Sequence, residues 1–185
     1  MTPDAPAPPS GPVLPDLDED IDLQVRREAL RFGLRGAGMA TALLPLVAAM
    51  MLWPAWRAAR EGGPQAVQQG AAVAVIALIT AVIALWRWHF IWRLRRPGLI
   101  DTLDLPALRA LEREIVANAG LSGLNWCLAT LALWPWLSPG DASLHAVILA
   151  GSAALAAFFM SLIGRTLEFL ILPMLVPLVA VSAMG

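Results

Sequence analysis

The chain has 185 residues and a formal net charge of −1 at pH 7, and 58% of its residues are hydrophobic against 15% charged. Soluble domains are about half apolar, so this composition, with a mean hydropathy of +0.67, excludes an ordinary soluble domain and predicts a membrane protein. All 13 basic residues are Arg, and no basic surface rich in aromatic side chains occurs, so no nucleic-acid partner is expected.

The first 20 residues form a proline-rich and acidic stretch. They contain six prolines and few large apolar side chains, so they bury too little surface to offset the entropy of ordering. We therefore predict a disordered tail over residues 1–20 and a membrane helical domain over residues 21–185. That domain opens with apolar side chains set among arginines, which predicts a short helix at the membrane surface, capped by Asp20 or Asp22. About 35 mostly polar residues precede the first apolar run, which excludes a cleaved signal peptide.

Five apolar segments of the right length for membrane helices follow. Their approximate bounds are 36–53, 68–88, 119–137, 144–163 and 166–184. Seven tryptophans near their ends are expected to anchor them in the headgroup layer, namely Trp53, Trp56, Trp86, Trp88, Trp92, Trp134 and Trp136. Arg87 and Arg93, which lie among these tryptophans, are expected to snorkel to the membrane surface. The predicted fold is all-α, a polytopic membrane bundle of about five transmembrane helices with cytoplasmic amphipathic helices.

The link between the second and third segments has an amphipathic pattern. Pro97 and Gly98 break the chain, and apolar side chains then recur at helical spacing from Asp101 to Asn118. Asp104 is the expected N-cap, because its side chain can accept a hydrogen bond from the first helical turn. We expect this helix to continue into the third crossing, and we expect a tight turn over residues 138–141 after it.

The arginines predict the orientation of the bundle. Eleven of the 13 lie before the first segment, in the link after the second, or in the turn before the fifth. Only Arg57 and Arg60 lie on the other side, so the positive-inside rule places the amino terminus in the cytoplasm. Five crossings would then leave Gly185 outside the cell.

Groups that could support catalysis or bind a cofactor are sparse. The two histidines, His89 and His145, fall at opposite ends of the predicted bundle, so one haem cannot take both. A haem or metal held by a single histidine is left as an alternative to a histidine that meets lipid headgroups. The motifs of phosphate-binding loops, zinc proteases, dithiol redox sites and serine hydrolases do not occur. We predict no catalytic residue, no cofactor, no metal ligand and no enzyme activity for this chain.

Four residues of the fifth segment are candidates for a sensing or switching role. Arg165 and Glu168 are three residues apart on one helical face, where a carboxylate is costly unless it is paired or exposed. They form either an ion pair at the membrane surface or a sensor of protons or ligand that moves the helix. Pro173 and Pro177 each remove a backbone donor and should kink the helix, either as a packing device or as a joint that conveys a signal.

Small and polar side chains predict how the helices associate. The fourth segment has a run of small residues, Ala150, Gly151, Ser152, Ala153, Ala154, Ala156 and Ala157. Such residues permit close approach to a helix of the same chain or of a second copy. Asn125 in the third segment is expected to hydrogen-bond to a neighbouring helix. The expected partners are the lipid bilayer and, through membrane helices, a second copy of the chain, whereas the ligand is unknown.

Three stretches together resemble a known kind of membrane region. They are Gly-Leu-Asn-Trp at 123–126, the small-residue fourth segment, and the sequence FLILPMLVP at 169–177. Over residues 22–185 the chain resembles the multi-pass sensory region that precedes GGDEF-type diguanylate cyclase domains, EAL-type phosphodiesterase domains and some histidine kinases. The resemblance implies a role in signal input at a bacterial inner membrane. No GGDEF, EAL, HAMP or kinase sequence and no sixth crossing is present, so no catalytic residue is carried over.

Three classes of function remain in view. The leading hypothesis is the sensory, input and anchoring region of a signal-transduction protein, non-catalytic in itself. Because the predicted fifth crossing ends outside the cell, we expect this chain to be a fragment that lacks its cytoplasmic output domain. The alternative is an accessory or assembly subunit of a larger membrane complex. A transporter is disfavoured, because the first four segments contain no carboxylate or lysine in the apolar interior that could couple ions.

Overall fold

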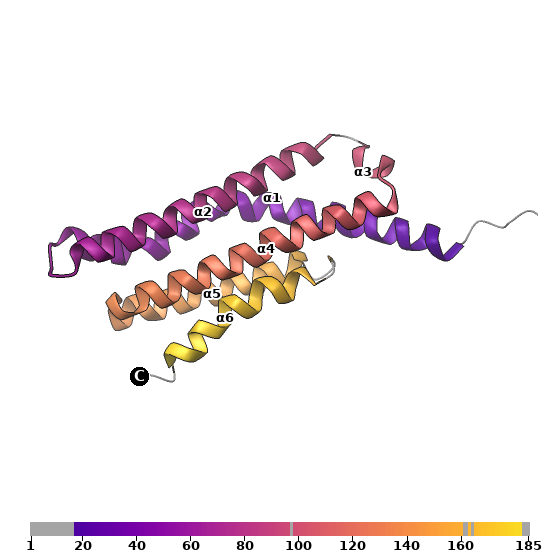
Figure 1. The fold of residues 1–185 in the computed structure, drawn as a ribbon. Helices are drawn as coiled ribbons and strands as arrows, with labels where there is room; N and C mark the ends of the chain where they lie inside the picture. Colours follow the sequence, from indigo (N-terminus) through magenta and orange to yellow (C-terminus); the bar gives the residue numbers. More distant parts are fainter. Residues whose placement is uncertain (1–16, 97, 161–162, 164, 183–185) are drawn as a thin grey trace, which may run out of the picture.

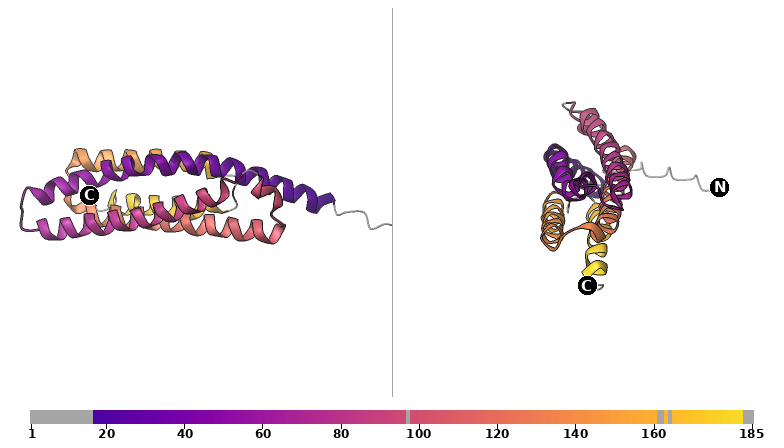
Figure 2. Two further views of the ribbon diagram at one scale, coloured as in Figure 1. Left: turned by 90° about the horizontal axis from the view of Figure 1, so that it is seen from above. Right: turned by 90° about the vertical axis from the view of Figure 1, so that its left-hand side faces the viewer.

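The protein is a bundle of helices. In the computed structural model the described residues are 17–96, 98–160, 163 and 165–182, and none of these is in a β-strand. The helices are α1 (Leu17–Arg60), α2 (Ala66–Leu94), α3 (Leu99–Thr102), α4 (Leu105–Leu133), the 3-10 helix η1 (Trp134–Trp136), α5 (Pro139–Met160) and α6 (Thr166–Ser182). The long helices run along the bundle, and α3 lies at one end of it (Figures 1 and 2). The predicted all-α class is confirmed.

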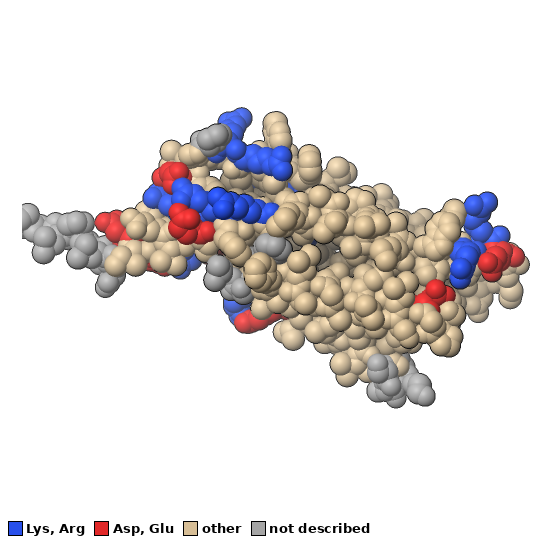
Figure 3. All heavy atoms as spheres, turned by 180° about the vertical axis from the view of Figure 1, so that it is seen from behind, with Lys and Arg blue, Asp and Glu red and all other residues tan. Residues whose placement is uncertain are grey.

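Four helical stretches are long and apolar enough to cross a membrane. They are α1, α2, α4 together with η1, and α5. The apolar helix α6 is shorter, with 17 residues, and its rise gives a length of ~26 Å against a hydrocarbon core of about 30 Å. On the face drawn in Figure 3, charged side chains gather towards the two ends and the middle carries none. This distribution is that expected of a multi-pass membrane protein.

α1 differs from the prediction at its start. The predicted surface helix and the predicted first crossing form one continuous helix of 44 residues. No proline interrupts its backbone before Pro45, and Asp20 and Asp22 are favourable near the positive end of the helix dipole. The helix begins at Leu17, so the prediction of disorder is wrong for residues 17–20, which are helical. The rest of that predicted tail, residues 1–16, lies outside the described residues.

The amino-terminal part of α1 packs against α3 and α4. The Arg26 guanidinium lies 2.9 Å from a carboxylate oxygen of Glu112 on α4, and Arg27 Nη2 donates a hydrogen bond of 2.8 Å to the carbonyl of Leu103. Beneath these contacts lies a cluster of buried apolar side chains, Leu30, Ala37, Phe90, Ile91, Leu94, Ile100, Leu108, Leu111, Ile115 and Ile163. The arginine-rich start of α1 is thus held by contacts within the protein.

The start of α4 confirms one prediction and corrects another. Asp104 is the N-cap, and its side chain accepts a hydrogen bond of 2.9 Å from the N–H of Ala107. The helix predicted to begin at Asp101 begins instead at Leu105, because Leu103 is extended and separates the short α3 from α4. From Leu105 one helix continues into the third apolar segment, as predicted.

The turn between η1 and α5 is shorter than predicted. α5 already begins at Pro139, whereas the prediction extended the turn to Asp141. Ser138 Oγ accepts a hydrogen bond of 3.2 Å from the Asp141 N–H and donates one of 2.6 Å to Asp141 Oδ2. A serine cap followed by proline in the first helical position is a favourable helix start, so Gly140 is drawn into the helix.

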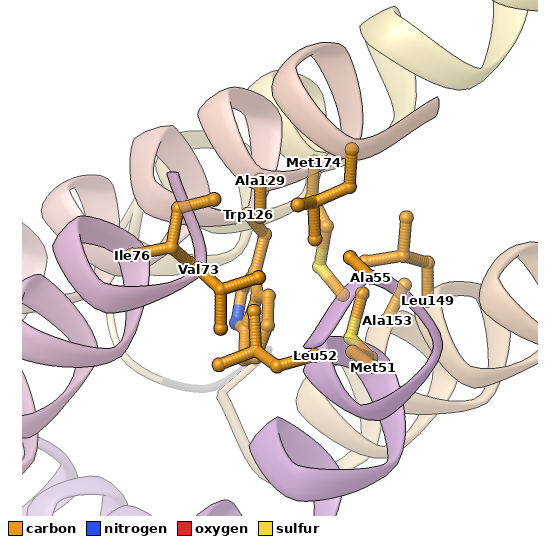
Figure 4. Packing of buried hydrophobic residues seen from close by; sticks show 11 residues of the cluster. Met51, Leu52, Ala55, Val73, Ile76, Trp126, Ala129, Leu149, Ala153 and Met174 are labelled. Carbon is orange, nitrogen blue, oxygen red and sulfur yellow. The ribbon is translucent and has the colours of Figure 1, made fainter. Parts of the chain in front are cut away.

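The main apolar core lies where the long helices meet. Figure 4 shows side chains of α1, α2, α4, α5 and α6 converging there. The buried members are Met51, Leu52, Ala55, Val73, Ile76, Trp126, Ala129, Leu133, Leu149, Ala153 and Met174. Trp126 is 6% exposed, so it packs in this core, and Trp136, which was expected at a helix end, packs against the same core while partly buried.

α6 approaches α4 closely at Gly123. A Cβ atom at this position would lie 2.5 Å from the carbonyl oxygen of Leu170 and 3.0 Å from that of Phe169. Pro173 has no N–H, so the Phe169 carbonyl, four residues earlier, lacks its usual helical donor. A glycine lets the α4 backbone lie against these carbonyls, where weak Cα–H···O contacts are favourable. The glycine of the Gly-Leu-Asn-Trp stretch thus has a packing role.

Candidate functional site

Polar side chains of α2 and α4 face one another inside the bundle. On α2 they are Thr80 and Arg87, and on α4 they are Asn118, Ser122 and Asn125. Spacings of three, four and seven residues place each set on one face of its helix. Asn125 Nδ2 donates a hydrogen bond of 2.8 Å to Thr80 Oγ1, which confirms the predicted bond between helices.

Arg87 is the charged member of this set. Its Nε donates to Asn118 Oδ1 at 2.8 Å, and its Nη2 donates to Ser122 Oγ at 2.5 Å. Both acceptor residues are buried. Among the described residues, no carboxylate oxygen lies within 4.0 Å of the Arg87 guanidinium. Two neutral groups therefore hold a cation that has no counter-ion in the described part of the chain.

The same residues line a cavity between α1, α2, α4, α5 and α6. Its volume is about 150 Å³, which is enough for a molecule of the size of benzene. The polar set described above forms one wall. The α1 wall consists of small and apolar residues, Gly36, Ala37, Ala40, Leu43, Leu44 and Val47. The cavity therefore has a cationic wall and an apolar wall.

Asn125 presents an unpartnered acceptor at this cavity. Its Oδ1 is buried and has no hydrogen-bond donor among the described residues, although its Nδ2 is bonded to Thr80. A buried acceptor without a donor costs about 1–3 kcal/mol. Such atoms are normally satisfied by water or a ligand. The site thus has an acceptor to offer as well as a cation.

The prediction that Arg87 snorkels to the membrane surface is wrong. Its neighbour Trp88 is exposed, but Arg87 lies on the helical face that meets α4 and is fixed there by Asn118 and Ser122. The sequence contained a signal for this, because Arg87 is seven residues after Thr80 and so shares its helical face. Only the pairing of α2 with α4 shows that this face is opposite three polar residues.

Arg165 and Glu168 form the expected ion pair at the start of α6. Arg165 Nη2 lies 2.9 Å from Glu168 Oε2, and the two side chains are 74% and 55% exposed. The Arg165 guanidinium also lies over the ring of Phe169, 5.6 Å from its centroid. The pair is separate from the interior cavity. Its role as a sensor stays a prediction.

We expect Glu168→Gln to change the free energy of unfolding by less than about 1 kcal/mol, because exposed ion pairs contribute little to stability. Thermal unfolding of the purified chain in mild detergent measures this change, with Arg165→Gln as the matched control. A signalling output that is unchanged by Glu168→Gln would rule out the sensor hypothesis for this pair.

The two prolines lie inside α6, as predicted. Pro177 is fully buried, and α6 packs against α4 and α5. Figure 1 shows α6 slanting relative to α4. The loss of two backbone donors in a helix of 17 residues weakens its internal hydrogen bonding. The switching role of Pro173 and Pro177 stays a prediction.

The predicted tryptophan anchors differ in their surroundings. Trp53, Trp88 and Trp92 are exposed, as an anchor in the headgroup layer requires. Trp56 is also exposed, and the Arg60 guanidinium lies 4.9 Å from the centroid of its ring. The remaining three, Trp86, Trp134 and Trp136, are partly buried. Their anchoring role in a membrane stays a prediction.

The histidines lie apart, on α2 and α5. His89 is exposed, whereas His145 is 2% exposed and its Nε2 lies 3.1 Å from Thr130 Oγ1. The Nδ1 of His145 has no partner among the described residues. Within those residues, no group of three or more His, Cys, Asp or Glu side chains is placed to hold a metal ion. The cavity lined by Arg87 is therefore the strongest candidate site.

This site depends on the pairing of α2 with α4, and no local sequence motif predicts that pairing. Its parts are a cation, an unpartnered acceptor and an apolar void inside one bundle. No protein-family model, curated protein or solved structure matches the chain.

Proposed function

We propose that this chain is the membrane-embedded input region of a bacterial signal-transduction protein, non-catalytic in itself, which senses a ligand inside its helical bundle. The observation that carries the proposal is the cavity lined by Arg87, because all of the long helices contribute to its walls. On α6 these contributions come from Leu170 and Met174. A bound molecule would therefore change the packing of α6.

α6 is suited to such a response. Pro173 and Pro177 leave it with fewer internal hydrogen bonds than an ordinary helix, so its shape depends more on its neighbours. Its contact with α4 at Gly123 lies next to Leu170, a residue that lines the cavity. A ligand that moves Leu170 would move this contact as well. In the proposed mechanism, this movement of α6 is the signal.

Five crossings and a cytoplasmic amino terminus are part of the same proposal. The turn before α2 and the turn before α5 lie at one end, where Trp136 Nε1 donates a hydrogen bond of 3.0 Å to Gln65 Oε1. Arg57 and Arg60 lie near this end. Ten of the other 11 arginines lie in the first half of α1, in or just after the last turn of α2, early in α4, or just before α6, whereas Arg87 lies inside the bundle. The positive-inside rule favours the arginine-rich end for the cytoplasm.

Reporter fusions would test this orientation. We expect a phosphatase that is active only outside the cytoplasm to be active when it is inserted at Gly63. We expect it to be inactive at Gly98, where a protein that fluoresces only in the cytoplasm should instead be bright. Both glycines are exposed and lie outside the helices, so the insertions disturb no helix. The reverse pattern would contradict the proposed orientation.

The coding sequence beyond Gly185 tests the input role directly. If the proposal is correct, it encodes a further apolar segment and a cytoplasmic output domain of the cyclase, phosphodiesterase or kinase type. A continuation with neither would overturn the proposal.

A homodimer through membrane helices belongs to the same proposal. Ala150, Gly151 and Ala154 lie exposed on α5, where small side chains permit close approach of a second helix. Purification in mild detergent separates this assembly from the accessory-subunit alternative. A homodimer supports the input role, and a stable complex with a different membrane protein supports the alternative.

A further inference from the structure

We propose that the cavity binds an anionic amphiphile, whose carboxylate or phosphate group is held by Arg87 and whose alkyl chain lies along the apolar walls. This inference rests on the proposed input function and names the chemical class of its ligand. It draws on the missing counter-ion, on the donors that Arg87 leaves unused, and on the form of the cavity.

Arg87 differs from Arg26 and Arg93, which also bond to α4, because no carboxylate pairs with it among the described residues. Arg26 lies 2.9 Å from Glu112, and Arg93 lies 2.6 Å from Glu114. Arg87 bonds only to the neutral side chains of Asn118 and Ser122. A charge inside an apolar bundle is costly unless an opposite charge pairs with it. An anionic group in the cavity would provide that charge.

The bonds of Arg87 also determine how it can bind a ligand. Asn118 and Ser122 occupy Nε and one N–H of Nη2, which fixes the plane of the guanidinium. Nη1 makes no hydrogen bond to the described residues, and Arg87 lines the cavity. The unused N–H groups suit the oxygens of a carboxylate or a phosphate, which guanidinium binds through more than one hydrogen bond.

The rest of the cavity suits an alkyl chain. Apart from the polar wall of α2 and α4, its lining is mainly aliphatic, with Leu43 and Val47 from α1, Leu155 from α5, and Leu170 and Met174 from α6. The volume of about 150 Å³ takes a chain segment of roughly six carbon atoms. Because the cavity is partly open, a longer chain can continue out of the bundle.

A second basic region provides the competing location for an anion. Arg109, Arg113 and Arg165 line a shallow groove along α4 and α6, together with Phe169 and Leu124. Arg109 and Arg113 are exposed, so water already stabilises their charges. An anionic headgroup on this surface would bind without Arg87, and a variant of these two arginines therefore serves as the matched control.

The test measures binding of dodecanoate to the purified full chain in nanodiscs of phosphatidylcholine, with dodecyl phosphate, dodecanol and dodecylamine as comparison probes. We expect dodecanoate and dodecyl phosphate to bind at least about tenfold more tightly than dodecanol or dodecylamine, since charge-assisted hydrogen bonds discriminate by this much or more. We expect Arg87→Met to remove this difference. Arg87→Lys, which keeps the charge without the planar fork, should retain part of it.

The double variant Arg109→Met/Arg113→Met should bind dodecanoate like the native chain. Equal binding of dodecanoate and dodecanol by the native chain would overturn the proposal, even if Arg87→Met failed to fold. So would loss of binding in the double variant with retention in Arg87→Met, because the site would then be the surface groove. Binding to the purified chain does not depend on an output domain. The chain could therefore fail to bind the amphiphile and still have the input role, and it could bind the amphiphile without having that role.

The same anionic chemistry has two sources, a membrane phospholipid and a free fatty acid. Adding phosphatidylglycerol to the nanodiscs distinguishes them. If it displaces dodecanoate, the site takes the headgroup and one chain of a membrane lipid. If it does not, the site selects a free single-chain acid. Either result supports an anionic amphiphile.

Discussion

Replacing Gly123 by alanine is expected to lower the free energy of unfolding by about 1–3 kcal/mol, the usual effect of overpacking a close contact. The added methyl group would lie 2.5 Å from the carbonyl oxygen of Leu170. Because this neighbour is backbone, α6 must move as a whole to relieve the clash. The clash must also outweigh the intrinsic helix preference of alanine over glycine, which by itself would stabilise the variant by about 1 kcal/mol.

Gly38→Ala is the matched control for Gly123→Ala. Gly38 lies inside α1, and a Cβ atom there would have no atom within 4 Å apart from its chain neighbours and the nearby backbone of its own helix. We expect this variant to be neutral or more stable by up to about 1 kcal/mol. Thermal unfolding of both variants in the same detergent measures the difference. Equal stabilities would show that α4 and α6 are not in close contact at Gly123.

Replacing Asn118 by leucine is expected to lower the free energy of unfolding by about 1.5–3 kcal/mol, the range for hydrogen bonds to charged groups. Asn118 is 8% exposed, and its Oδ1 accepts the bond from Arg87 Nε. Loss of the Asn118 side chain leaves the Nε–H of Arg87 inside the bundle without an acceptor. Denaturant or thermal unfolding measures the change.

The double variant Arg87→Leu/Asn118→Leu separates lost hydrogen bonding from lost packing. Removal of both polar partners leaves neither group unsatisfied, so we expect the double variant to regain most of the stability that Asn118→Leu loses. If the effects of the two single variants simply add in the double variant, Arg87 and Asn118 are not coupled. That result would contradict the hydrogen bond between Arg87 and Asn118.

The fold class followed from the sequence because the apolar pattern depends only on local composition. The segment predicted at 68–88 falls within α2, and all but the last residue of the segment predicted at 119–137 falls within α4 and η1. The N-cap Asp104 was predictable for the same reason, since capping involves only the first helical turn. The start of α1 was not predictable, because its arginine-rich and apolar stretches differ in composition although no proline separates them and one helix runs through both.

The interior site could be predicted only in part. Asn125 was expected to bond to another helix, because an amide in an apolar segment has few other partners. Its partner, Thr80, could not be named from the sequence, since the register of α2 against α4 depends on how whole helices pack. For Arg87 the local context gave the wrong answer, because the surrounding tryptophans favour a membrane surface and the contacts that turn it inward come from α4.

The sequence by itself determined that this protein is helical and apolar enough for a membrane, and that Asp104 caps a helix, because hydropathy, capping and helical spacing act within one segment. Only the tertiary structure decided which helical faces meet. It placed Gly123 against the α6 backbone, and it placed Arg87 between two neutral side chains beside an apolar cavity. These contacts join residues that are 31 or more positions apart, and such pairings depend on the packing of the whole bundle.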